Sequence, residues 1–470
     1  MADAPELDDI QGIITFAYGD LRAACFVMLG IKDDASARAW LGTLGPRLTT
    51  AGGTPGPAAI NVAITAAGLR RLGLPAPAVD AFAPEFVDGM VTPTRSRQLG
   101  DIGASAPATW AWGGNQAEPV DLVLMLYSRD QGGLDTLYRA QAAGFEGGGL
   151  AQQAKLDTSD LGVVEPFGFR DGISQPLVEG FPGTTGAGTD QVKCGEFVLG
   201  YPNEYGLYTD RPLLDVSADP GRVLPRDPSG SGRADLGRNG TFLVFRQLEQ
   251  DVAGFWQFVD RRSRRAGPPD PSAREHLAAR LVGRWPSGAP LVQAPDRDAP
   301  GLATANDFGY FHEDPDGLRC PIGSHIRRTN PRDSLDPKPG TQASLDIGKR
   351  HRILRRGREY GSRLLPEQAI AAAGSDPGER RGLYFACVNG NIGRQFEFIQ
   401  RTWVNNPKFD GLYDDRDPLV ATEPGGSFTI PGLPVRTRLT GLPSFVTVTG
   451  GAYFFLPGIR ATRYLATLPR

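Results

Sequence analysis

The possible folds are limited above all by an alternation of strand-like and helix-like segments that occurs twice along the chain. In the first half, four segments rich in β-branched or aromatic residues are predicted as strands: 12–18, 23–31, 58–65 and 120–128. The alanine- and leucine-rich stretches 34–44 and 134–144 lie between them and are predicted as helices. This alternation indicates an α+β fold.

A long loop-rich region separates the first half from the second. From about 181 to 240 the composition shifts to Gly, Pro, Asp, Ser and Thr, which is typical of surface loops and of a domain junction. Beyond it, 241–248 and 382–388 are predicted as strands, and 444–458 as two strands around a Gly-Gly turn. Helices are predicted at 249–261, from its helical spacing of apolar residues, and at 395–403.

Each half thus has about four strands and two or more helices, the content of a ferredoxin-like βαββαβ unit. At 470 residues, the chain is also longer than one hydrophobic core usually supports. We therefore predict two ferredoxin-like domains, residues 1–235 and 236–470, lying side by side.

Charge and composition exclude several classes of function. The 50 basic and 53 acidic residues nearly cancel to a net charge of -3, which provides no general attraction for nucleic acid or an anionic membrane. No apolar run is long enough to span a bilayer, and the acidic N-terminus resembles neither a secretory nor a twin-arginine signal. The four cysteines form no CxxC pair, which disfavours a disulfide scaffold and a cysteine zinc site. We expect a cytoplasmic protein.

Imidazole ligands are scarce, because the chain has only four histidines: His276, His312, His325 and His351. His325 lies in RCPIGSHIRRTNPR, where Pro and Gly residues fix an irregular backbone and three arginines, Arg327, Arg328 and Arg332, surround the imidazole with positive charge. This setting suits an imidazole ligand with anionic groups close by. The alternative is a basic surface loop whose histidine only makes local hydrogen bonds.

Two further segments carry candidate functional residues. In VEPFGFRDGISQP, at 164–176, Asp171 lies in a Gly- and Pro-bounded turn where the backbone can approach a flat ligand, although Asp-Gly is often plain turn chemistry. In HRILRRGREYG, at 351–361, four arginines cluster near a possible strand end, although most arginine runs are solvated faces. Taken singly, these segments do not identify an enzyme.

Together, and in this order, the segments GFRDG, CPIGSHIRRTNPR and ILRRGREYG resemble the signature of dye-decolorizing peroxidases. Other blocks, such as DIQGIITFAY, GEFVLGYPNEYG and RGLYFACVNGNIGRQFEFIQRTW, also resemble family segments, so the likeness covers residues from about 8 to 465. The long inserts between blocks are similar to those of the larger subgroups of the family. The resemblance implies two ferredoxin-like domains arranged like a dimeric α+β barrel, with one haem b per chain held mainly by the C-terminal domain.

The resemblance also implies roles for individual residues. His325 corresponds to the proximal iron ligand and Asp171 to the distal acid-base residue. Arg355 corresponds to the distal arginine, judged from Tyr360 and Gly361 downstream, although Arg352 and Arg356 lie close enough to compete for this role.

Contacts to the edge and propionates of the haem are implied for two stretches. These stretches contain Gly172, Ile173, Ser174, Asn330 and Arg332. The first stretch follows Asp171 directly, so the N-terminal domain is expected to contribute the distal loop.

Such residues suit the reduction of hydrogen peroxide coupled to the oxidation of dyes, phenols or other aromatic donors. A carboxylate can take a proton from one peroxide oxygen and deliver it to the other, and a guanidinium can stabilise the developing negative charge. An acceptor on the second ring nitrogen of His325 would make the imidazole a stronger donor. Glu397 is our candidate acceptor, with an ordinary helix-face carboxylate as the alternative.

Some interpretations stay open at this stage. Large dyes could be oxidised at the surface through a Tyr or Trp relay, and Trp403 is a candidate, although a helix-face tryptophan is more often core. A haem-binding protein for storage, sensing or iron release, with incidental peroxidase activity, is one alternative function. A domain pair that binds partners without a cofactor is another. The oligomeric state is not predicted.

Overall fold

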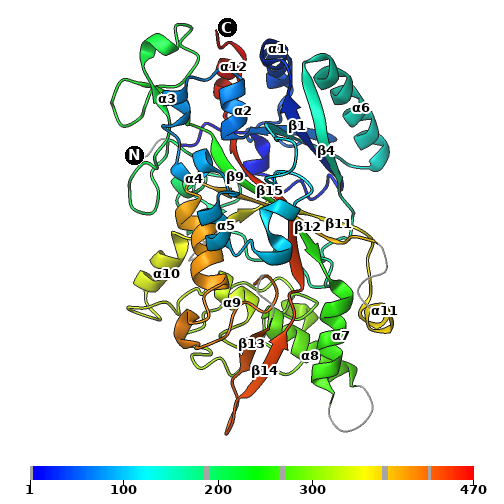
Figure 1. Cartoon of the computed structure of the whole chain (residues 1–470). Helices are drawn as coiled ribbons and strands as arrows, with labels where there is room; N and C mark the ends of the chain where they lie inside the picture. Colours follow the sequence, from blue (N-terminus) through cyan, green and yellow to red (C-terminus); the bar gives the residue numbers. More distant parts are fainter. Residues whose placement is uncertain (1–3, 185–190, 265–269, 373–378, 422–424, 470) are drawn as a thin grey trace.

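A computed structural model describes residues 4–184, 191–264, 270–372, 379–421 and 425–469 (Figure 1). The first half contains one ferredoxin-like unit, in which four antiparallel strands have the order β2-β3-β1-β4. Its elements are β1 (Ala23–Ile31), α1 (Asp34–Leu44), β2 (Ala58–Ile64), β3 (Leu122–Ser128), α6 (Gln131–Gly147) and β4 (Leu150–Asp157).

The second half repeats this topology, with the strand order β10-β12-β9-β15 and β11 beside β12. Its elements are β9 (Thr241–Gln250), α7 (Val252–Ser263), β10 (Leu354–Arg355), β11 (Arg358–Tyr360), β12 (Gly382–Asn389), the π-helical segments η9 (Gly393–Glu397) and η10 (Ile399–Val404), and β15 (Val446–Leu456). The predicted α+β fold of two ferredoxin-like units is confirmed.

The two units share one sheet and one core. Phe455 of β15 pairs with Ile64 of β2, which joins the strands into a nine-stranded sheet. The inner faces of the two units meet where the Phe26 ring lies 5.0 Å from the ring of Phe245 and 5.8 Å from that of Tyr384. At the other edge, Ser159 N donates to Glu359 O at 2.8 Å. The units therefore enclose a common interior like that of an α+β barrel, and the boundary at residue 235 stays a prediction.

Smaller elements surround this framework. Helices are α2 (Ala66–Arg71), α3 (Ala76–Val79), α4 (Pro84–Asp88), α5 (Pro93–Leu99), α8 (Pro271–Val282), α9 (His325–Thr329), α10 (Gln342–Lys349), α11 (Pro366–Ala371) and α12 (Ile459–Ala466). Strands are β5 (Leu177–Val178), β6 (Gln191–Val192), β7 (Leu213–Leu214), β8 (Ala234–Asp235), β13 (Gly426–Ile430) and β14 (Thr437–Leu442). In the described part of 181–240, only two-residue strands and short turns occur, as a loop region predicts.

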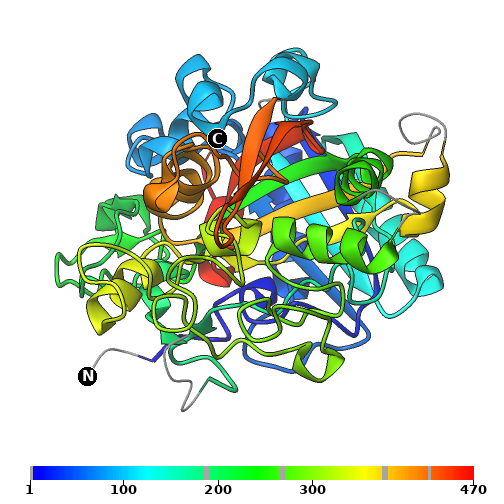
Figure 2. The ribbon, with the colours of Figure 1, turned by 90° about the horizontal axis from the view of Figure 1, so that it is seen from below.

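Several helices lie at the two ends of the sheet. Figure 1 shows α1, α2 and α12 at the upper end and α7, α8, α9 and the β13–β14 hairpin at the lower end. Seen from below in Figure 2, the green and yellow segments of the second half lie across that end of the sheet. Among the described residues, no helix combines the length and the apolar character needed to cross a bilayer.

Two sequence predictions about strands are wrong. Residues 12–18 are not a strand: Gly12–Ile14 form a single 3-10 turn, buried in the common interior, so their apolar character reflects burial rather than strand pairing. The Gly-Gly pair at 450–451 does not form a turn, because β15 runs through it with a bulge after Val448. A Cβ atom at Gly450 would lie 2.4 Å from Trp112 Nε1, so glycine there lets the strand pass the indole.

Candidate active site

One cavity brings together the three sequence motifs. It lies against the face of β9, β12 and β15 that carries Arg246, Leu248, Phe385 and Val448, and it extends to α9 and η10. Its lining includes Asp171, Ile173, Ser174, His325, Asn330, Arg332, Arg352 and Arg355. Since Asp171 and Arg355 are 184 positions apart in the chain, only the folded structure makes them neighbours.

Asp171 and Arg355 form a direct ion pair in this cavity. Arg355 Nη1 donates to Asp171 Oδ1 at 2.6 Å, and Gly172 N donates to the same oxygen at 2.6 Å. The loop is also tied to β10, because Gln175 accepts a hydrogen bond from Arg355 N at 3.1 Å and donates one to Arg355 O at 3.3 Å. The side chains of Arg355 and Asp171 are 31% and 38% exposed, and both line the cavity.

The environment of Asp171 favours its ionised form. Burial alone would raise the pKa of this carboxyl, but the Arg355 charge and the Gly172 N–H outweigh it, and the pKa is lowered. Asp171 is therefore an ionised carboxylate, able to accept a proton.

His325 begins α9 and is oriented by a buried carboxylate. Its Nδ1 lies 2.8 Å from Asp417 Oδ2, while Asp417 Oδ1 accepts from Leu419 N and Val420 N at 3.0 Å. Burial opposes protonation of the imidazole, but the charge and hydrogen bond of Asp417 prevail and raise the pKa of His325. With Nδ1 donating to Asp417, Nε2 keeps its lone pair for a metal, and the carboxylate strengthens it as a donor.

The predicted acceptor for His325, Glu397, is wrong. Both Glu397 oxygens accept from Arg95 Nη1 at 2.9 Å, and Oε1 also accepts from the hydroxyl of Tyr453 at 2.9 Å. Glu397 ends a π-helical segment, so helical spacing did not predict which way its side chain faces. Sequence reasoning missed Asp417. The only local pattern there is an aspartate whose side chain accepts from backbone N–H groups two and three residues later, as in an ordinary turn.

The neighbouring arginines separate into two groups. Arg332 and Arg352 line the cavity, whereas Arg327 and Arg328 are buried and donate to backbone carbonyls. Arg356 points to the opposite face of the strand, towards the interior shared by the two units, where it donates to Ile13 O and Ile14 O. Arg355 is therefore the arginine that binds Asp171.

The two stretches predicted to contact a haem edge also meet. Asn330 Nδ2 donates to Ser174 Oγ at 3.2 Å, which links the end of α9 to the Asp171 loop. Ile173, Ser174, Asn330 and Arg332 all line the cavity. Gly172 contributes the N–H that binds Asp171.

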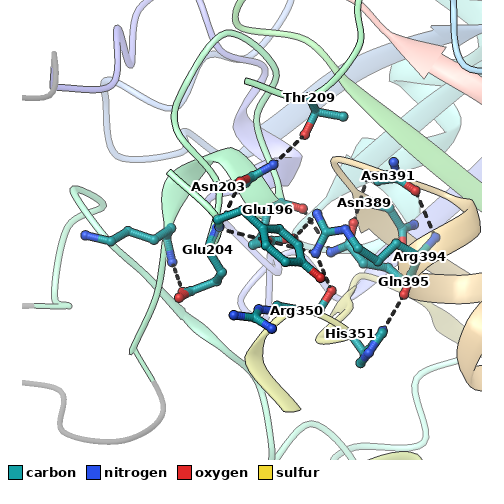
Figure 3. Close-up of polar contacts among 12 residues, drawn as sticks. Glu196, Asn203, Glu204, Thr209, Arg350, His351, Asn389, Asn391, Arg394 and Gln395 are labelled. Carbon is teal, nitrogen blue, oxygen red and sulfur yellow. Dashed lines mark hydrogen bonds and ion pairs between the residues drawn. The ribbon is translucent and has the colours of Figure 1, made fainter. Parts of the chain in front are cut away.

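The chain segment before β10 is held by a buried polar cluster (Figure 3). Glu196 is fully buried and binds Arg394, with 2.7 Å between Oε2 and Nη2. Arg394 Nη1 in turn donates to Arg350 O at 2.6 Å, and Gln395 Nε2 donates to Arg352 O at 2.7 Å. These bonds fix the backbone that carries Arg352 to the cavity.

The cavity fits a haem better than a bare metal ion. Among the described residues, no group of three or more His, Cys, Asp or Glu side chains could hold a metal ion. His325 alone among the four histidines lines the cavity, so a metal there needs a prosthetic group with its own equatorial ligands. Apolar side chains on the sheet face suit a flat macrocycle, and Arg332 and Arg352 suit its two carboxylates. The Tyr310 hydroxyl, buried beside the cavity, has no hydrogen-bond partner within the described residues.

Known proteins resemble this chain over nearly its whole length. The multifunctional dye peroxidase DyP2 of Amycolatopsis sp. is 31% identical over 493 residues, covering 98% of this chain and 96% of that protein. A dye-decolorizing peroxidase of Mycena epipterygia is 31% identical, covering 99% of this chain and 88% of that protein. No protein-family model matches the chain.

Solved structures agree with these relatives. A dye-decolorizing peroxidase in complex with 2,6-dimethoxyphenol has a TM-score of 0.78 and 27% identity, over 98% of this chain and all of that chain. An ancestral D-type dye-decolorizing peroxidase has a TM-score of 0.77 and 28% identity, over 98% of this chain and 99% of that chain. The chain therefore belongs to the dye-decolorizing peroxidases, a family of hydrogen-peroxide-dependent haem oxidoreductases.

Proposed function

We propose that this protein binds one haem b per chain, with His325 as the iron ligand, and uses hydrogen peroxide to oxidise phenols, dyes or other aromatic donors. The observation that carries the proposal is the presence, in one cavity, of an Asp171–Arg355 pair at 2.6 Å and a His325–Asp417 pair at 2.8 Å. One pair offers a proton acceptor and a fixed cation, and the other offers a metal ligand.

When bound, the haem supplies an iron that binds peroxide and accepts its oxidising equivalents. Asp171 takes a proton from one peroxide oxygen and delivers it to the departing oxygen. Arg355 keeps Asp171 ionised and stabilises the negative charge that develops as the oxygen–oxygen bond breaks. Asp417 orients His325 and raises its basicity.

The donors we propose are small phenols and dyes. A phenol, 2,6-dimethoxyphenol, is bound in the solved structure of one relative. The relay proposed for Trp403 stays a prediction. Its side chain is buried and packs edge-on to His351 and Phe398, at ring distances of 5.3 Å each, so it would have to relay rather than contact a donor.

The test is expression with haem supply, followed by absorbance spectroscopy and peroxide-dependent oxidation of 2,6-dimethoxyphenol. We expect a Soret band and turnover in the natural protein. Asp171→Asn should keep the haem and lose roughly 100- to 10,000-fold in kcat, because proton transfer is removed. The exposed Asp135→Asn on α6 is the matched control and should behave like the natural protein. Full haem loading without peroxide-dependent oxidation would contradict the proposal and favour a haem-storage role.

A further inference from the structure

Peroxide reduction consumes protons as well as electrons. Hydrogen peroxide, two electrons and two protons yield two waters, and Asp171 only moves a proton from one peroxide oxygen to the other. A phenol brings a proton along with each electron. A donor without a transferable proton brings none, so the protons must then enter the cavity from solvent.

Glu359 lies on the same face of its strand as Arg355. The β10–β11 segment keeps one register with β12, with Arg355 opposite Cys387 and Glu359 opposite Leu383. Because strand side chains alternate, Arg355, Gly357 and Glu359 face the same side, and all three line the cavity. Residue 357 is a glycine, so no side chain separates Glu359 from Arg355 along this strand. A larger residue would not fit there, because its Cβ would lie 2.6 Å from Tyr384 O.

Glu359 also borders the molecular surface. Its carbonyl accepts from Ser159 N at 2.8 Å, next to the exposed Asp160 in the loop that follows β4. Glu359 is half-buried and also lines the cavity, so the residue borders both that loop and the cavity. Within the described residues, the hydrogen bond to this carboxylate comes from its own backbone N–H, so the group is free to exchange a proton.

Burial and two nearby carboxylates favour proton binding by Glu359, and Arg358 opposes it. The charged groups that act on it are Asp171, Arg358 and Asp160. The Arg358 guanidinium donates to the carbonyls of Ala17, Tyr18 and Leu21, which holds it on the face of the strand opposite the cavity. Burial, followed by the two carboxylates, raises the pKa of Glu359 to about 7.

A second cavity carboxylate, Glu165, has a different task. Its oxygens accept from Phe167 N and Phe169 N at 3.0 Å and from Gln250 Nε2 at 2.9 Å. These bonds hold the loop that carries Asp171, and giving them up would disturb that loop. Glu165 is therefore a structural anchor, although burial raises its pKa to about 7 as well.

We propose that Glu359 is the group through which protons from solvent enter the cavity and reach Asp171. This inference rests on the role proposed above for Asp171. Glu359 acts through Asp171, so it is a proton-relay residue rather than part of the peroxide-cleaving pair.

The test compares two electron donors in the haem-loaded protein: hexacyanoferrate(II), which carries no transferable proton, and 2,6-dimethoxyphenol, which does. We expect Glu359→Gln to lower kcat with hexacyanoferrate(II) roughly tenfold at neutral pH and to leave the phenol rate nearly unchanged. Glu359→Asp, which restores an acid, should recover much of the loss. Glu249→Gln is the matched control, because strand alternation points Glu249 away from the cavity residues Leu248 and Gln250.

Two further readouts separate a proton relay from a structural effect. In the natural protein, the hexacyanoferrate(II) rate should fall as pH rises through about 7, since the protonated donor form is lost, and Glu359→Gln should remove this inflection. Infrared difference spectra should show a protonated carboxyl band that disappears over the same range, with a part that Glu359→Gln removes. An unchanged donor ratio and an unchanged band in Glu359→Gln would overturn the inference. If Asp171→Asn also kept full activity, the proposed function itself would fail.

Discussion

The two ferredoxin-like halves share a strand order but differ in what covers the outer face of the sheet. In the first half, Val27 and Leu29 of β1 belong to an apolar core with Leu41 of α1 and Phe145 of α6. In the second half, the outer face of β9 presents Arg246 and Gln250 to a cavity. The same framework can thus be closed by helices or left open to hold a cofactor.

The position of the helices explains this difference. In the first half, α1 and α6 pack directly on the sheet. In the second half, α7 packs its apolar residues, among them Phe255 and Trp256, against Phe167 and Phe169 of the loop that leads to Asp171. Because α7 packs against that loop, it leaves part of the sheet face uncovered, and the cavity lies there.

The strongest test of the comparison removes the metal ligand of the second half. His325→Ala should lower haem affinity by more than about 100-fold, because no other histidine lines the cavity. The apoprotein should still unfold cooperatively in a thermal scan, since His325 belongs to none of the apolar clusters that make up the core. Haem titration followed by absorbance measures the effect. His276→Ala, whose ring stacks on Trp285 at 5.1 Å, is the control, and stoichiometric haem in His325→Ala would refute the assignment.

A smaller effect is expected from the carboxylate behind this ligand. Asp417→Asn should weaken haem binding or peroxidase activity about 10- to 100-fold, because the imidazole loses a charged acceptor. Glu397→Gln is the matched control: it disturbs Arg95 and Tyr453 but should leave the imidazole in place. Haem titration and resonance Raman spectra of the iron–imidazole bond distinguish the two variants. Equal losses in both would mean that Asp417 has no special role.

The ion pair of the cavity predicts a shift in pH dependence. Because the Arg355 charge helps to lower the pKa of Asp171, the ionised base persists into acidic solution, and activity falls only as pH drops through that lowered pKa. Arg355→Leu should therefore move the acid limb of kcat upward by roughly one to three pH units, besides lowering the rate. Arg352→Leu, in the same cavity, should leave the acid limb in place. An acid limb that does not move in Arg355→Leu would contradict this electrostatic role.

The smallest effect on activity is expected in the first half. Leu41→Ala should cost about 2–5 kcal/mol in the free energy of unfolding, because its buried side chain fills the core under α1. The kcat of the haem-loaded variant should stay nearly unchanged. Leu248→Ala, in the wall of the cavity, should destabilise the apoprotein less, since open space already borders this side chain. Denaturant unfolding measures both, and the reverse order would contradict the contrast between the halves.

Local pattern predicted much of this molecule correctly. The strands at 23–31, 58–65 and 120–128 and the helix after β9 agree with the structure, because residue type and spacing reflect local backbone preference and burial. The strand predicted at 12–18 is wrong because its apolar residues are buried without pairing to another strand. Gln11 holds the turn in place by donating to Val62 O and Pro457 O, each at 2.9 Å. The residue pattern around Gln11 does not indicate hydrogen-bond partners so far away in the chain.

Residue order and periodicity predicted the two βαββαβ units, and the resemblance of three motifs to a known family predicted the candidates Asp171, His325 and Arg355. The folded structure was needed to show that Arg355 rather than Arg356 binds Asp171, and that Asp417 rather than Glu397 is hydrogen-bonded to His325. The physical reason is that these choices depend on the direction of side chains from segments far apart in the chain. That direction is set by strand register, helix type and packing together.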